Sequence, residues 1–94
     1  MNEETITPAE LTVVPGLRVH RPIPIVIEES AEDVLARWVE PGLTGFGGSE
    51  GEAIESLAAI ILDVWTSLHA GDAVRGSNAR RIVTVLENYA APAP

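Results

Sequence analysis

The sequence predicts an α+β domain in which a three-stranded antiparallel meander packs on one long helix, with a second short helix after it. Two observations carry this prediction. Ile23, Ile25 and Ile27 alternate within residues 21–28, the pattern of a strand with one buried face. A long stretch with apolar residues at helical spacing begins after the glycine-rich segment 45–48. Because 94 residues is the length of one domain, we assign a single β-β-β-α-α domain to residues 21–90.

Three segments with strand-like patterns, separated by turn residues, predict the meander. The strands are expected at residues 21–28, 34–39 and 43–46. Two prolines in the first segment cannot donate to a ladder, so this strand should lie at a sheet edge or start at one. In the second strand, Val34, Ala36 and Trp38 should share one face. Pro41 and Gly42 suit the following turn, where glycine can adopt a positive φ.

The two ends of the chain are expected to lie outside this unit. Residues 1–20 are predicted to be a leader that is partly mobile or holds one short strand, because Pro8 and Pro15-Gly16 interrupt its apolar segments. Residues 91–94 alternate alanine with proline. Since proline cannot continue a helix, we expect a stiff, extended tail there.

Both helices have recognisable start signals. Ser49 and Glu52 form a capping box, in which Ser49 accepts from the backbone three residues on and Glu52 reaches back to the N–H of Ser49. Gly71 is a plausible stop for this helix, and Ser77 is a candidate cap for the next one. The helices are expected at residues 49–68 and 78–90.

Composition limits the classes of partner. The chain has 14 acidic residues against 6 arginines, no lysine, and a formal net charge of −8. This balance argues against nucleic acid and anionic membranes as partners, because both bind through basic side chains, and it suits a basic protein. The absence of cysteine excludes disulfides and thiolate zinc sites and is compatible with a reducing cytoplasm, where we expect the protein. A domain this small is also a natural candidate for homo-oligomerisation.

An acidic cluster lies at the predicted loop between the first two strands. It consists of Glu28, Glu29, Glu32 and Asp33. Mg²⁺ or Ca²⁺ ligation needs convergent oxygens, and a short hairpin loop rarely supplies enough of them. We therefore interpret the cluster as a solvated loop that keeps the neighbouring strand soluble, and we expect neither a metal nor a cofactor.

No catalytic or nucleotide-binding constellation is predicted. His20 and His69 are the two histidines, 49 residues apart, and neither is flanked by the nucleophile and carboxylate that a hydrolase requires. The glycine-rich segment before the first helix has no following lysine, and Glu50 and Glu52 would repel a phosphate. We therefore expect the protein not to be an enzyme.

The aromatic residues offer candidate contacts for a protein partner. Trp38 on a strand is either a core residue or an interface anchor, and Phe46 at the end of the third strand is a second candidate anchor. The candidate partner-binding residues are therefore Glu28, Glu29, Glu32, Asp33, Trp38 and Phe46.

Residues 21–68 resemble the HicB-like antitoxin family. The similarity lies in the isoleucine-rich hairpin, the turn Glu40-Pro41-Gly42, and the helix opening at Gly48-Ser49 and Glu52-Ala53-Ile54. The turn lacks the apolar residue that the family has before its proline. The resemblance implies a partial ribonuclease-H-like or double-stranded-RNA-binding-like topology. It also implies a small, basic HicA-type ribonuclease toxin as the partner, and here a short form without a DNA-binding domain.

The leading functional hypothesis is a non-enzymatic module that covers such a toxin by steric occlusion and charge complementarity. The alternative is a self-assembling structural or adaptor domain that reuses the same scaffold for another client. A small enzyme that uses the histidines or carboxylates is a third hypothesis, and the sequence shows no convergent set of residues for it.

Overall fold

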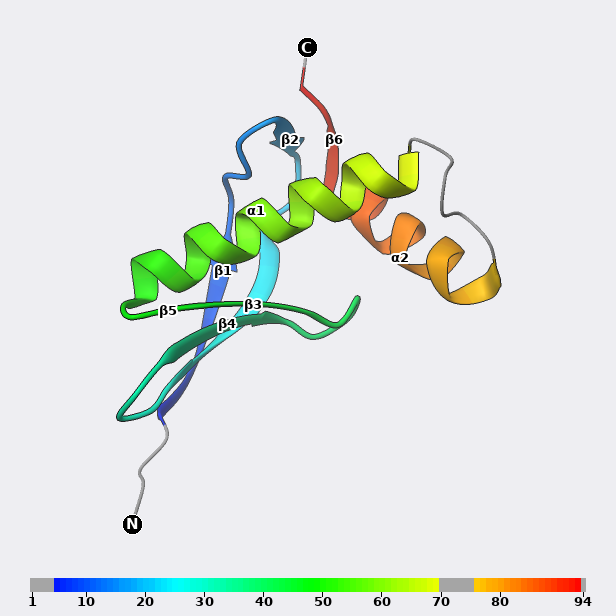
Figure 1. The fold of residues 1–94 in the computed structure, drawn as a ribbon. Helices are drawn as coiled ribbons and strands as arrows, with labels where there is room; N and C mark the ends of the chain where they lie inside the picture. The colour runs from blue at the N-terminus through cyan, green and yellow to red at the C-terminus, as the bar shows by residue number, and fades with distance from the viewer. Residues whose placement is uncertain (1–4, 70–75, 94) are drawn as a thin grey trace.

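The computed structural model describes residues 5–69 and 76–93, which form an α+β domain (Figure 1). The strands are β1 (Thr5–Leu11), β2 (Leu17–Val19), β3 (Ile23–Glu29), β4 (Val34–Trp38), β5 (Leu43–Gly47) and β6 (Ala90–Pro92). The helices are α1 (Glu50–His69) and α2 (Gly76–Tyr89). A four-stranded antiparallel sheet in the order β1-β3-β4-β5 packs on α1, and β2 pairs with β6 in a separate two-stranded sheet.

The predicted meander is confirmed in its strands, faces and turn. β3 pairs with β4 and β4 with β5, both antiparallel. Val34, Ala36 and Trp38 are buried on the face that α1 covers, as their alternation predicts. The turn after β4 closes with a hydrogen bond from the Gly42 N–H to the Val39 carbonyl at 3.1 Å, and Gly42 has the expected positive φ of 75°.

The prediction of a three-stranded sheet with a separate leader is incomplete, because residues 5–11 add a fourth strand. β1 pairs along the whole of β3, from Thr5 opposite Glu29 to Leu11 opposite Ile23. β3 is therefore an inner strand where it pairs with both β1 and β4. Of the two predicted alternatives, an edge strand is wrong, and a strand that starts at an edge fits the sheet. β1 was not predicted as part of the sheet because Pro8 interrupts the hydrophobic pattern of this segment. Its pairing with β3 is a contact between distant segments, which alternation along one strand does not reveal.

The prolines fit this sheet because of their register. Pro8 lies opposite Val26 and Pro24 opposite Glu10, two positions of the same type in the β1–β3 ladder. Since proline has no N–H to donate, these are positions whose backbone groups point away from the partner strand. On the other side of β3, pairing with β4 covers only Val26 to Glu29. Pro24 lies outside that range, so its missing N–H costs no hydrogen bond to β4. The start of β3 is thus open on one side, as its prolines suggest.

The two helices and the tail differ from prediction in their details. α2 begins at Gly76, so Ser77 lies inside it and not at the cap position. The tail is extended as expected, but Ala90–Pro92 forms β6 on β2 and does not project freely. The predicted stop at Gly71 lies outside the described residues. Neither described helix is both long enough and apolar enough to span a bilayer.

The capping box at the start of α1 is present with a shifted return bond. The Glu52 N–H donates to Ser49 Oγ at 3.2 Å, as predicted. The Glu52 carboxylate accepts from the N–H of Gly48 at 2.8 Å and not from that of Ser49. Both bonds fix the chain where β5 turns into α1, which sets the angle at which the helix crosses the sheet.

α1 approaches β5 closely because two residues of that strand lack side chains. A Cβ at Gly45 would lie 2.7 Å from the Cα of Leu57, and one at Gly47 would lie 2.9 Å from the backbone of Glu52. The core beneath α1 consists of buried hydrophobic residues from β1, β3, β4 and both helices, and Leu43 of β5 packs against it while partly buried. Among the described residues none that is polar or charged is buried.

Candidate functional site

The sheet has a second face that neither described helix covers (Figure 1). The register sets three rows of side chains across it. The first row is Ile6, Glu28, Leu35 and Phe46; the second is Pro8, Val26, Arg37 and Thr44; the third is Glu10 and Pro24, with Val39 just beyond β4. We call this surface the open face.

The open face holds most of the large hydrophobic side chains that are exposed in the described residues. Phe46 is 65% exposed, Val39 64% and Ile6 62%. Val13, at 68%, is the other such residue, and it lies on the loop between β1 and β2. Single exposed hydrophobic residues are common on proteins, whereas several on one sheet face indicate a contact surface.

An ion pair crosses the centre of the open face. Arg37 Nη1 lies 3.2 Å from Glu28 Oε2, with the side chains 43% and 18% exposed respectively. Val26 lies directly opposite Arg37, and Leu35 directly opposite Glu28, so apolar neighbours flank both charges. Because each charge has its partner, this pair leaves little net charge between the exposed hydrophobic residues.

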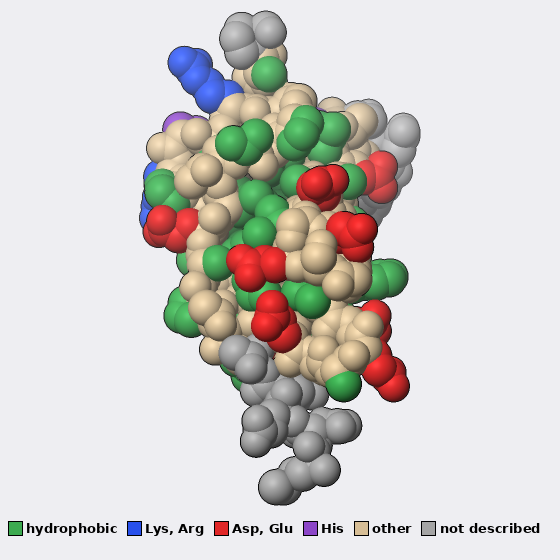
Figure 2. All heavy atoms as spheres, turned by 90° about the vertical axis from the view of Figure 1, so that its left-hand side faces the viewer, with side chains coloured by type: hydrophobic (Ala, Val, Ile, Leu, Met, Phe, Trp, Pro, Cys, Tyr) green, Lys and Arg blue, Asp and Glu red, His purple; other side chains and the backbone are tan. Residues whose placement is uncertain are grey.

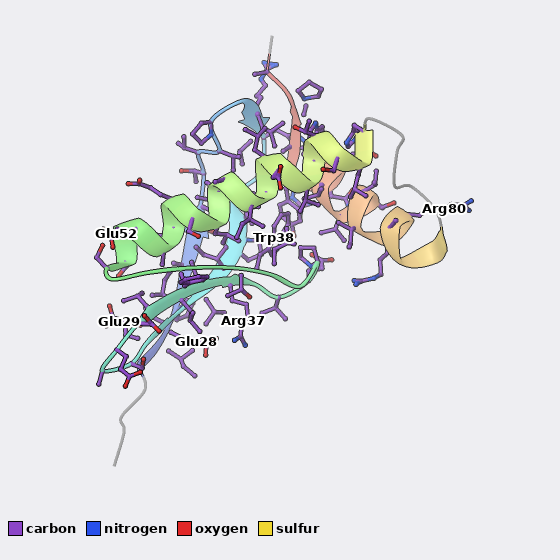
Figure 3. The ribbon with its side chains drawn as sticks, in the orientation of Figure 1. Glu28, Glu29, Arg37, Trp38, Glu52 and Arg80 are labelled. Atoms are coloured by element: carbon purple, nitrogen blue, oxygen red, sulfur yellow. The ribbon has the colours of Figure 1, made fainter. Side chains whose placement is uncertain are left out.

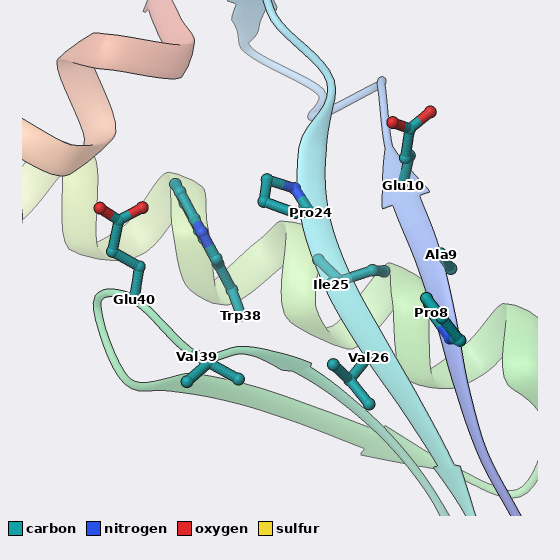
Figure 4. Close-up of a pocket in the computed structure, with 9 residues that line it drawn as sticks. All are labelled: Pro8, Ala9, Glu10, Pro24, Ile25, Val26, Trp38, Val39 and Glu40. Carbon is teal, nitrogen blue, oxygen red and sulfur yellow. The ribbon is translucent and has the colours of Figure 1, made fainter.

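A pocket of about 650 Å³ lies where β3 and the end of β4 separate (Figure 4). β1 continues along β3 past Val26, while β4 has no further pairing with β3 beyond Arg37. We call this pocket the notch; its walls are Pro8, Pro24, Ile25, Val26, Trp38 and Val39. Glu10 and Glu40 line it on opposite sides, and Figure 4 shows their carboxylates toward the same end of it.

The acidic residues named from the sequence do not form one cluster. Glu28 lies on the open face and is paired, whereas Glu29 is exposed at the end of β3. Glu32 and Asp33 are exposed in the turn, where the Ser30 N–H donates to the Asp33 carbonyl at 3.0 Å. In the described residues no group of three or more acidic or histidine side chains is placed to hold a metal ion.

Negative charge nevertheless dominates one end of the molecule. Glu28, Glu29 and Glu52 all lie toward the end at which α1 begins (Figure 3). Figure 2 looks onto that end and shows acidic side chains spread over it, with hydrophobic side chains between them. Arg80 lies at the opposite end, on α2 (Figure 3). Acidic side chains therefore predominate at the end where α1 begins, in a molecule whose net charge is −8.

Trp38 is a core residue, one of the two alternatives that the sequence left open. It is 1% exposed and therefore cannot serve as a surface anchor in this structure. Its ring packs edge-to-face on Tyr89 with a centroid distance of 5.4 Å, and the guanidinium of Arg21 lies 4.6 Å from the centre of the Tyr89 ring. The indole N–H is buried without a hydrogen-bond acceptor in the described part of the chain.

The histidines meet in a second, smaller pocket, which their separation in the sequence did not indicate. His20 and His69 line it together with Glu87. His69 stacks on Trp65, donates from Nδ1 to the Trp65 carbonyl at 2.9 Å, and donates from Nε2 to Glu87 at 3.1 Å. Since both ring nitrogens are engaged, His69 has none left for a substrate proton, and the arrangement supports a structural role.

The pKa of His69 is raised above the ordinary value of 6.5. Partial burial lowers this pKa, but the hydrogen bonds to Glu87 and to the Trp65 carbonyl, together with the charge of Glu87, outweigh the burial. Because both ring nitrogens donate, the protonated form is the one that this geometry fits.

Comparison with known proteins gives no further assignment. The chain matches no protein-family model, no curated protein and no solved structure.

Of the candidate partner-binding residues named from the sequence, the structure places Glu28 and Phe46 on the open face, where Ile6 and Val39 also lie without having been predicted. From the sequence, Ile6 falls in the predicted leader and Val39 at the end of the second predicted strand. The β-branched run Thr5-Ile6-Thr7 is the signal that could have indicated β1, since such residues favour strands. The relation of Ile6 to Phe46, three strands away, depends on the register of the whole sheet.

Proposed function

We propose that this protein is a non-enzymatic binding module that docks a small basic protein on its open face, in the manner of a HicB-like antitoxin covering a HicA-type ribonuclease toxin. The observation that carries the proposal is that Ile6, Val39 and Phe46 are all exposed on one uncovered sheet face in a strongly acidic molecule. Residues 21–68 supply the resemblance to the family. The partial ribonuclease-H-like or double-stranded-RNA-binding-like topology belongs to the same proposal.

Exposed apolar residues and exposed acidic residues would contribute to binding in different ways. Ile6, Val39 and Phe46 would lose exposed apolar area on docking, which supplies affinity at about 25 cal/mol per Å² removed from water, less the costs of association. Exposed Glu29 and Glu32 would attract the basic partner and raise its association rate. Covering a ribonuclease in this way blocks substrate access without any chemistry by this chain.

The test combines light scattering after size-exclusion chromatography with a titration against an inactivated HicA-type toxin. We expect a defined hetero-complex, and we expect Phe46→Ser to weaken it about tenfold or more, because aromatic residues are enriched among those that dominate binding energy at protein interfaces. Val13→Ser is the matched control, because Val13 is equally exposed but lies off the open face. Absence of a complex, or equal effects of the two substitutions, would contradict the proposal.

A second copy of the chain is the alternative occupant of the open face. Ile6, Leu35 and Phe46 share one row, so two such faces could pack as the layers of a β-sandwich do. The net charge of −8 opposes this association, and we therefore expect self-assembly to strengthen with salt. A homodimer that Phe46→Ser dissociates, and that ignores the toxin, would favour this alternative.

A further inference from the structure

We propose that the notch between β3 and the end of β4 binds one arginine or lysine side chain. The inference rests on the proposed function in one respect, namely that this side chain would belong to the basic partner. The notch is a feature of the backbone, because β4 separates from β3 while β1 continues to pair with it. It is therefore present before any partner arrives.

The walls of the notch fit the stem of a long basic side chain. Pro8, Pro24 and Val26 present apolar surface, with Trp38 and Ile25 beneath them. The methylene groups of arginine and lysine pack favourably on such surface while the charged head stays near solvent. A volume of about 650 Å³ admits this side chain together with some of the main chain that carries it.

The rim of the notch fits the charged head. Glu10 and Glu40 lie on opposite sides of the notch. Both are exposed, so their carboxylates stay hydrated and carry no desolvation penalty. Neither carboxylate has an ion pair with a described residue. Two carboxylates beside an apolar channel favour a cation over a neutral or anionic group of the same shape.

The two carboxylates should not contribute equally. The guanidinium of Arg81 donates to the backbone carbonyl of Glu40 at 2.9 Å, which places a positive charge next to that residue. Glu10 pairs across the ladder with Pro24 and has no arginine in its ladder row. We therefore expect Glu10 to supply the larger part of the attraction for a cation.

Two small probes separate charge from shape. N-Butylguanidinium reproduces an arginine side chain, and N-butylurea has nearly the same shape without the charge. We would titrate each into the isotopically labelled 94-residue protein and follow the amides of Val26 and Val39 and the indole N–H of Trp38 by NMR. The expected result is a saturable shift of these signals with N-butylguanidinium, and binding of N-butylurea at least about threefold weaker.

Variants identify the carboxylates. We expect Glu10→Gln to weaken N-butylguanidinium binding about two- to fivefold and Glu40→Gln to weaken it less, with Asp63→Asn, an exposed acidic residue on α1, as the control without effect. Equal affinity for the two probes, the absence of a saturable shift, or equal effects of Glu10→Gln and Asp63→Asn would overturn the proposal.

The outcomes also separate this proposal from the proposed function. If the toxin binds the wild type and the double variant Glu10→Gln/Glu40→Gln with equal affinity, the notch does not hold a side chain of that partner, while the open face remains its docking surface. If N-butylguanidinium binds but no hetero-complex with the toxin forms, the notch is a cation site and the proposed function fails.

Discussion

The two faces of the four-stranded sheet are formed by the same strands but differ in the burial of their side chains. On the face under α1, Ile25 and Ile27 are each 2% exposed and pack in a continuous hydrophobic core. On the open face, the neighbouring positions Val26 and Glu28 are half-buried, and Phe46 is largely exposed. Alternation along each strand therefore separates a face that stabilises the fold from a face that remains available for binding.

The difference between the two faces shows which apolar residues are explained by folding and which indicate a binding surface. A hydrophobic residue under α1 needs no functional explanation, because burial accounts for it. A hydrophobic residue on the open face gains little from folding, so several of them on that face are informative about binding. The predictions below test this division, beginning with the substitution of largest expected effect.

Truncation on the covered face should be far more destabilising than truncation on the open face of the same strand. Ile27→Ala removes a buried side chain and leaves a cavity, so we expect a loss of about 2–5 kcal/mol in the free energy of unfolding. Val26→Ala, one residue away on the half-buried face, should cost about 1 kcal/mol or less. Urea unfolding monitored by circular dichroism measures both. Similar losses would show that the open face is also part of the stabilising core.

A side chain added between the sheet and α1 should be the next most damaging change. At Gly45 a new Cβ would press on the backbone of Leu57, which cannot yield without moving the helix, so we expect Gly45→Ala to cost about 1–3 kcal/mol or more. Gly51→Ala is the control, because a Cβ there meets nothing within 4 Å in the first turn of α1. The control should be neutral or slightly stabilising, since alanine favours helix by about 1 kcal/mol over glycine. Thermal unfolding of both variants decides the matter.

The covered face could be predicted from the sequence much better than the open face. Ile23, Val34 and Trp38 follow simple alternation, and the capping residues locate the start of α1, so local patterns suffice for them. The open face depends on β1, whose pairing with β3 is set by contacts between distant segments. The notch depends on where β4 stops pairing, which no local pattern records. The meeting of His20 and His69 in one pocket likewise arises from the packing of separate elements.

The ion pair on the open face should contribute modestly and asymmetrically. A double-mutant cycle with Glu28→Gln and Arg37→Met should give a coupling energy of about 0.2–1 kcal/mol at low salt, because the pair is partly exposed. Arg37→Met should cost more than Glu28→Gln, since it leaves the less exposed charge, that of Glu28, without its partner. Glu28→Gln with Arg80→Met is the control cycle, and it should be additive. A larger coupling energy that salt does not reduce would mean that water reaches this ion pair less than the exposure of its side chains indicates.

The contact between His69 and Glu87 should have the smallest effect and a definite dependence on pH. It joins α1 to α2, and the protonated imidazole is the form that donates to both Glu87 and the Trp65 carbonyl. Because the pKa of His69 is raised in the folded protein, its contribution is complete below the ordinary value of 6.5 and is lost as the pH rises through the folded-state pKa. The contribution should stay at about 0.5 kcal/mol or less, since solvent screens this exposed pair. An NMR titration of the His69 ring should show its pKa falling toward 6.5 in Glu87→Gln, and an unchanged pKa would assign the shift to the Trp65 carbonyl instead. A loss of stability on raising the pH that is equal in the wild type and in Glu87→Gln would show that other groups hold α2 in place.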